Sequence, residues 1–146
     1  MTDNSPIDIL LVEDNPQDVE LTLRTLNKHH VANKIFVVMD GEEVLDFLYC
    51  RGKYTKRSNH IPKVIFLDIK LPKLNGLEVL KIIKMDDHLR HIPIVMLTSS
   101  VEDPDIEASY ALGANSYVVK PVDFNNFSET IKNLGMYWLI VNQPPK

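Results

Sequence analysis

The chain has 146 residues, which is the size of a single domain, and 45% hydrophobic with 25% charged residues is the mix of an ordinary globular protein. No apolar run approaches the length needed to cross a bilayer, and a net charge of −4 argues against a broad nucleic-acid-binding surface. The single cysteine, Cys50, excludes an intrachain disulfide and fits a reducing compartment. Because the first residues carry no basic and apolar leader, we expect a cytoplasmic protein.

Short apolar runs alternate with helical patterns five times along the chain. Strands are expected at residues 7–12, 34–39, 64–67, 94–97 and 116–119. Helices are expected at residues 16–29, 42–49, 77–85, 102–112 and 123–134. This alternation predicts an α/β fold, a doubly wound five-stranded parallel sheet of strand order 2-1-3-4-5 with helices on both faces.

The sequence divides into a short start, one domain and a tail. We expect residues 1–6 to be disordered, residues 7–135 to form the domain, and residues 136–146 to form an apolar, proline-containing tail. The tail has two interpretations: it folds back on the last helix, or Tyr137 and Trp138 anchor a partner protein. Residues 51–60 are polar and mostly basic, and are expected to form a solvated loop.

The central strand ends in a carboxylate. Residues 64–67 are apolar at every position, as expected of a strand covered by helices on both faces, and Asp68 follows directly. Pro72 and the Asn75-Gly76 pair then break the chain before the next helix. Asp68 therefore stands where ligands bind in open α/β sheets, outside the carboxyl ends of the strands.

Two more acids, Glu13 and Asp14, follow the first strand. In the order 2-1-3-4-5 the first and third strands are neighbours, so Glu13, Asp14 and Asp68 share one pocket. Clustered carboxylates raise each other's pKa unless a cation is present. Mg²⁺ accepts a few oxygen ligands while keeping several waters, so the sequence predicts a magnesium site here.

The fourth and fifth strands end in Thr98 and Lys120. Taken alone, Thr98 is typical of a β-forming residue at the end of a strand, and Lys120 is typical of a surface lysine. Together with the acids they supply a hydroxyl, an ammonium and a cation around one carboxylate. That set is what is needed to hold a phosphoryl group on Asp68 as an acyl phosphate.

In these motifs the sequence resembles the response-regulator receiver domain of two-component signalling, which has a flavodoxin-like fold. The matching segments are LVEDN at 11–15, FLDIKLP at 66–72 with Asn75-Gly76, LTS at 97–99 and GANSYVVKP at 113–121. They span residues 7–134, nearly the whole predicted fold. FLYCRG at 47–52 and YWL at 137–139 further resemble the single-domain regulators paired with bacterial, especially cyanobacterial, phytochrome kinases.

The resemblance implies a chemical role for each motif. Asp68 would accept a phosphoryl group from a phosphohistidine of a sensor histidine kinase, in the narrower resemblance a phytochrome. Asp14, Asp68 and the backbone carbonyl of Lys70 would ligate Mg²⁺, with Glu13 helping directly or through water. A lysine side chain at position 70 departs from the small or amide residue commonest there. Its ammonium would stand near the entry to the phosphoryl group, and the hypothesis is that Lys70 tunes the lifetime of the phosphorylated state.

The resemblance also implies a switch. Lys120 would pair with phosphoryl oxygens, Thr98 would bond to one of them and move inward, and Tyr117 would follow it. The Lys120–Pro121 peptide bond is expected to be cis.

We expect signalling through protein partners, without nucleic acid or membrane. The partners are the histidine kinase and a second copy of the chain, bound through the helix at 102–112, the strand at 116–119, the helix at 123–134 and the Tyr137/Trp138 tail. The protein is expected to be no enzyme beyond self-catalysed phosphoryl acceptance and autodephosphorylation. The alternative is a phosphorylation-independent adaptor of the same fold, against which the complete set of site residues argues.

Overall fold

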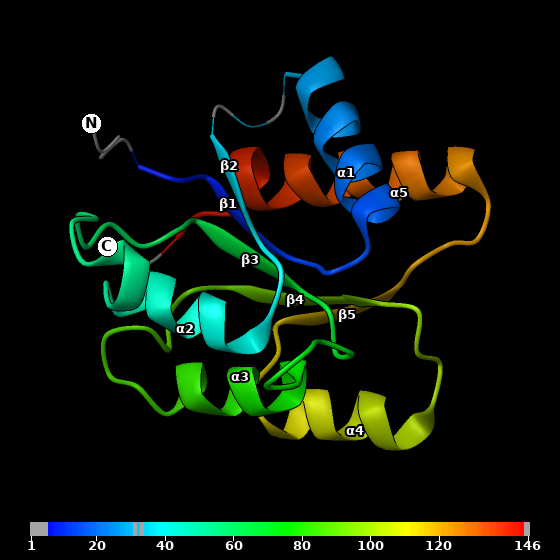
Figure 1. Ribbon diagram of the computed structural model, residues 1–146. Helices are drawn as coiled ribbons and strands as arrows, with labels where there is room; N and C mark the ends of the chain where they lie inside the picture. Colours follow the sequence, from blue (N-terminus) through cyan, green and yellow to red (C-terminus); the bar gives the residue numbers. More distant parts are fainter. Residues whose placement is uncertain (1–5, 31, 33, 145–146) are drawn as a thin grey trace.

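The computed structural model describes residues 6–30, 32 and 34–144, and folds them around one parallel sheet (Figure 1). The strands are β1 (Ile9–Val12), β2 (Ile35–Val38), β3 (Val64–Leu67), β4 (Ile94–Thr98) and β5 (Ser116–Val119). Their order is β2-β1-β3-β4-β5, with every neighbouring pair parallel. The predicted fold class and strand order are confirmed.

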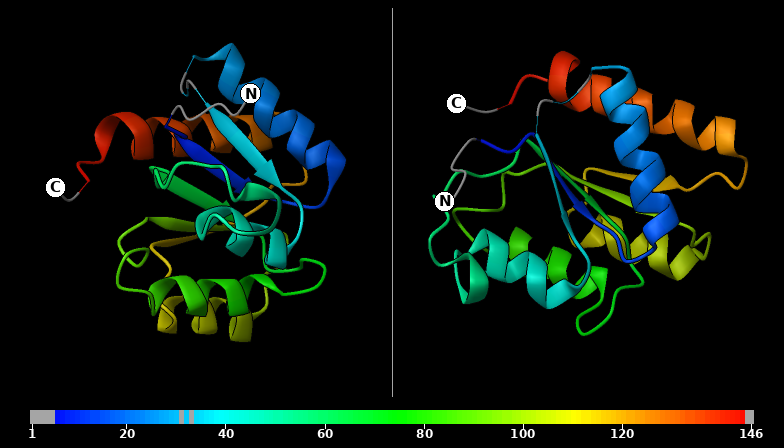
Figure 2. Two further views of the ribbon diagram at one scale, coloured as in Figure 1. Left: turned by 60° about the vertical axis from the view of Figure 1, so that its left-hand side comes forward. Right: turned by 45° about the horizontal axis from the view of Figure 1, so that its top comes forward.

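Two layers of helices cover the sheet. The helices α1 (Pro16–Lys28) and α5 (Phe124–Met136) lie on one face, and α2 (Gly41–Leu48), α3 (Gly76–Lys84) and α4 (Asp103–Ala111) lie on the other (Figures 1 and 2). Side chains alternate along each strand, so Leu10 and Val12 pack in the apolar cluster with α2 and α3, while Ile9 and Leu11 pack in the cluster with α5. Burial on both faces explains why the strands are apolar at consecutive positions.

The strand register aligns the functional edge. Val12 of β1 pairs with Leu67 of β3, and Thr98 of β4 pairs with Val119 of β5. The residues that follow these positions, including Asp68 and Lys120, therefore leave the sheet at the same edge.

Side-chain caps begin four of the helices at that edge. Asn15, Asp40, Asn75 and Asp123 each accept a hydrogen bond from a backbone N–H in the first turn of the helix that follows. Gly76 opens α3 so close to the end of β3 that a Cβ atom there would lie 2.0 Å from the carbonyl oxygen of Asp68. The backbone at position 76 therefore requires glycine.

The tail continues the last helix without a break. A π-helical segment, η2 (Tyr137–Val141), follows α5 directly. Trp138 and Leu139 pack against the cluster under α5, whereas Tyr137 and Ile140 are exposed. The tail thus extends α5, with one side packed on this cluster and apolar side chains also presented to solvent.

The predicted disorder of residues 1–6 falls almost wholly outside the described residues, and the limits 7–135 and 136–146 stay predictions. Within the described part of the chain, no helix is long and apolar enough to cross a membrane.

Candidate functional site

Three carboxylates meet at the carboxyl edge of the sheet. Glu13, Asp14 and Asp68 each offer an oxygen, and these oxygens lie within 4.8 Å of one another. Glu13 and Asp68 are buried and Asp14 is half-buried. The arrangement follows from the pairing of β1 with β3, as the sequence predicts.

The acidic trio fits a hard divalent cation. Its donors are all carboxylate oxygens, the ligands that Mg²⁺ and Mn²⁺ prefer. Burial raises the pKa of Glu13 to about 7, even though the hydrogen bond and charge of Lys120 act in the opposite direction. A divalent cation in the trio would favour the charged form of this carboxylate.

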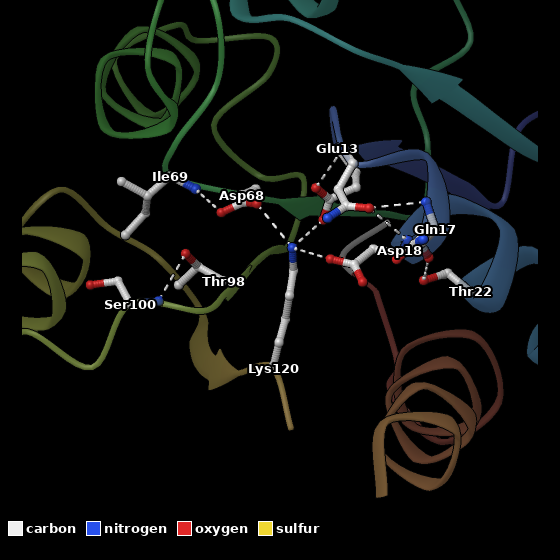
Figure 3. Close-up of polar contacts among 10 residues, drawn as sticks. Glu13, Gln17, Asp18, Thr22, Asp68, Ile69, Thr98, Ser100 and Lys120 are labelled. Carbon is white, nitrogen blue, oxygen red and sulfur yellow. Dashed lines mark hydrogen bonds and ion pairs between the residues drawn. The ribbon is translucent and has the colours of Figure 1, made fainter. Parts of the chain in front are cut away.

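Lys120 reaches into the site from the end of β5 (Figure 3). Its Nζ lies 3.0 Å from Asp68 Oδ2 and 3.0 Å from Asp18 Oδ2, and also contacts Glu13. Burial works against the charged amine, but the hydrogen bond to Glu13 and the charges of Glu13 and Asp68 outweigh it and raise the pKa of Lys120 above its ordinary value. The side chain is therefore a buried ammonium held by carboxylates.

Both oxygens of Asp68 have a partner. Oδ2 accepts a hydrogen bond from Lys120, and Oδ1 accepts one from the backbone N–H of Ile69 at 2.7 Å. These two contacts hold the carboxylate in one orientation at the end of β3.

Thr98 and Tyr117 are linked through Ser100. The buried Thr98 hydroxyl accepts a hydrogen bond from the backbone N–H of Ser100, with 3.3 Å between the heavy atoms. The Tyr117 hydroxyl donates to the carbonyl oxygen of Ser100 at 3.0 Å, and the Ser100 hydroxyl donates to Asp105 in α4 at 2.6 Å. The end of β4 is thus connected to both β5 and α4.

The structure brings Glu13, Asp14, Asp68 and Lys120 together, while Thr98 lies at the same edge with its hydroxyl bonded to Ser100 (Figure 3). The side chain of Lys70 is exposed.

The expected cis bond before Pro121 is wrong, since the described residues contain no cis peptide bond. The trans form is the intrinsically favoured one, and Lys120 contacts Asp68 with the bond in that form.

Sequence reasoning missed Asp18 and Ser100. The one sequence signal for Asp18 is that it is an acidic residue in the first turn of the helix that follows the first strand, and so lies near the end of that strand. Ser100 has the weaker signal of a polar residue two positions after Thr98.

A family profile described as "Response regulator receiver domain" matches residues 9–132, most of the chain. This chain belongs to the response regulator receiver domain family. The response regulator Rcp1 of Synechocystis sp. is 35% identical over 93% of this chain and 91% of its own length.

Solved structures of response regulators share the fold and cover nearly the whole chain. The phosphorylated cyanobacterial phytochrome response regulator RcpA superposes with a TM-score of 0.90 at 35% identity, covering 97% of this chain and 100% of RcpA. The Mn²⁺-bound form of Rcp1 superposes with a TM-score of 0.89 at 33% identity, covering 97% of this chain and 100% of Rcp1. The bacteriophytochrome response regulator AtBRR is 53% identical with a TM-score of 0.74, covering 95% of this chain and 99% of AtBRR.

Proposed function

We propose that this receiver domain is a single-domain response regulator that accepts a phosphoryl group on Asp68 from a sensor histidine kinase, a phytochrome. The observation that carries the proposal is the convergence of the Lys120 ammonium and the acidic trio on Asp68. RcpA, a phosphorylated cyanobacterial phytochrome response regulator, and AtBRR, a bacteriophytochrome response regulator, support the proposal by their similarity to this chain.

The proposed reaction is an in-line phosphoryl transfer. One Asp68 oxygen forms a bond to phosphorus while the bond from phosphorus to the donor's imidazole nitrogen breaks, and the electron pair of that bond stays on nitrogen. Lys120 stabilises the charge on the phosphoryl oxygens from a position 3.0 Å from Asp68. Mg²⁺, held by Glu13, Asp14, Asp68 and the carbonyl of Lys70, would neutralise further charge on those oxygens.

The proposed switch begins at Thr98. A phosphoryl group carries about two negative charges at pH 7, and the Thr98 hydroxyl has a proton to donate to it while accepting from Ser100. A displacement of Thr98 would move Ser100, and with it the hydroxyl of Tyr117 and the start of α4. Phosphorylation would in this way change the surface formed by α4 and β5.

We also propose a homodimer through α4, β5, α5 and the tail. Each of these elements exposes large apolar side chains, among them Tyr110, Val119, Phe124 and Tyr137. Trp138 packs partly inward, so Tyr137 is the stronger anchor of the two.

Incubation with acetyl phosphate and Mg²⁺, followed by intact mass, tests the phosphoryl-acceptor role. We expect a gain of one phosphoryl mass in the wild type and in Thr98→Ala, and none in Asp68→Asn or after chelation of the metal. A wild-type chain that gains no mass under these conditions would instead support the phosphorylation-independent adaptor.

A further inference from the structure

Asp18 is a third carboxylate on Lys120, beside Glu13 and Asp68 (Figure 3). An ammonium has three N–H protons, so these three acids fill the hydrogen-bonding capacity of Lys120. The side chain of Lys120 is 8% exposed and that of Asp18 is 27% exposed. Asp18 therefore holds the buried lysine from the solvent side.

Asp18 differs from the other two acids in its relation to the cation site. Among the described residues, the trio that could bind a metal consists of Glu13, Asp14 and Asp68. A cation there would draw on Glu13 and Asp68, and phosphorylation would convert the Asp68 carboxylate into an acyl phosphate whose charge lies on the phosphoryl oxygens. Asp18 takes part in neither change, so it would still pair with Lys120 after the cation has bound and after Asp68 has been phosphorylated.

Asp18 is held in place more firmly than the Lys120 side chain that it contacts. Asp18 lies in the first turn of α1, where its N–H donates to the Asn15 side chain at 3.3 Å and its carbonyl accepts from the Thr22 hydroxyl at 2.7 Å. The positive end of the helix favours a carboxylate there. Lys120, by contrast, reaches the site on a flexible four-carbon stem.

We infer that Asp18 is a positioning residue that holds the Lys120 ammonium beside Asp68 while the cation and the phosphoryl group enter. This inference rests on the proposed phosphoryl transfer. Without the charge of Asp18, the ammonium is drawn onto Glu13 and away from the phosphoryl oxygens. Formation of the bond between Asp68 and phosphorus then becomes slower.

The test compares two isosteric charge removals on α1. Asp18→Asn removes the charge that faces Lys120. Glu20→Gln removes a charge that pairs with Arg24 at the surface, where the side chains of Glu20 and Arg24 are 69% and 62% exposed. With acetyl phosphate as the donor and saturating Mg²⁺, we expect Asp18→Asn to gain phosphoryl mass about tenfold more slowly. Glu20→Gln should stay within about twofold of the wild type, since exposed ion pairs contribute little.

Two further measurements separate positioning from a merely structural role. Asp18→Glu keeps the charge. If that charge positions Lys120, the phosphorylation rate of Asp18→Glu should be within about threefold of the wild-type rate. In a Lys120→Met background, followed over long incubation, Asp18→Asn should have no further effect, because residues that act through one another are not additive.

Several results would overturn the inference. A wild type that gains no phosphoryl mass contradicts the proposed function itself. A wild type and an Asp18→Asn variant that react equally fast contradict only the role of Asp18. Recovery of the Asp18→Asn rate at Mg²⁺ above the concentration that saturates the wild type would assign Asp18 to the cation instead. An Asp18→Glu variant as slow as Asp18→Asn would show that the charge is not what matters.

Discussion

At the scale of single residues, Glu43 shows how side-chain contacts set a charge outside the candidate site. Its carboxylate accepts hydrogen bonds from the Tyr54 hydroxyl at 2.6 Å and the Met39 N–H at 3.0 Å, and pairs with Lys53 at 3.0 Å. Burial alone would raise the pKa of Glu43, but these contacts outweigh it and lower the pKa below its ordinary value. The stability that this carboxylate contributes is therefore present above its unfolded pKa and is lost as the pH falls through the folded pKa.

The variant Tyr54→Phe should be less stable by about 1 kcal/mol at pH 7, because it removes a hydrogen bond to a charged group. The difference from the wild type should shrink at acid pH, once the pH has fallen through the lowered pKa of Glu43. Urea denaturation at both pH values measures it. Tyr49→Phe is the matched control, since its hydroxyl bonds to the exposed Asp86 and should matter less. An equal loss for Tyr54→Phe at both pH values would contradict the assigned role of Glu43.

At the scale of elements, two glycines dock helices against the loop that follows Asp68. A Cβ atom at Gly76 would lie 2.0 Å from the carbonyl oxygen of Asp68, and one at Gly41 would lie 1.8 Å from that of Leu74. Neither backbone can give way without moving its helix, so Gly76→Ala and Gly41→Ala should each cost about 2 kcal/mol or more in stability.

The two glycine variants should differ in function. At a temperature where both are folded, Gly76→Ala should slow phosphorylation by acetyl phosphate, because it displaces the backbone of the acceptor. Gly41→Ala should leave the rate near that of the wild type, since it contacts the loop farther from Asp68. Equal rates for the two variants would show that the docking of α3 does not position Asp68.

At the scale of the whole molecule, the apolar surface of α4, β5, α5 and the tail predicts self-association. We expect sedimentation at tens of micromolar to give the mass of two copies. Replacement of Phe124 and Tyr137 by serine should shift the protein toward one copy. Met85→Ser is the control, since Met85 is strongly exposed at the far end of α3. A single-copy mass in both the phosphorylated and resting forms would contradict the dimer.

Sequence reasoning captured the fold because the inner strands β1, β3 and β4 are buried on both faces and therefore almost wholly apolar. The runs at 64–67 and 116–119 match β3 and β5 to the residue. The acidic trio followed from topology alone, since neighbouring parallel strands end at the same edge.

Contacts set by side-chain length and helix orientation could not be predicted in this way. The bond between Asp18 and Lys120 joins residues 102 positions apart and depends on the tilt of α1. Residues 51–60, expected to be a solvated loop, are held by Arg57, whose guanidinium lies 3.9 Å from the ring centre of Phe47 and donates to nearby backbone carbonyls. An arginine in a polar stretch gives no sequence sign of such stacking.

The junction between α5 and η2 carries a natural fluorescent probe. Trp138 is the chain's sole tryptophan, and it packs under the end of α5 with Tyr137 at 5.0 Å in an edge-on arrangement. Its fluorescence therefore reports on this one place, without any added dye. Tyrosine-to-tryptophan energy transfer and the indole emission maximum report whether η2 remains packed against the core. Both can be followed when the protein is phosphorylated or binds its kinase.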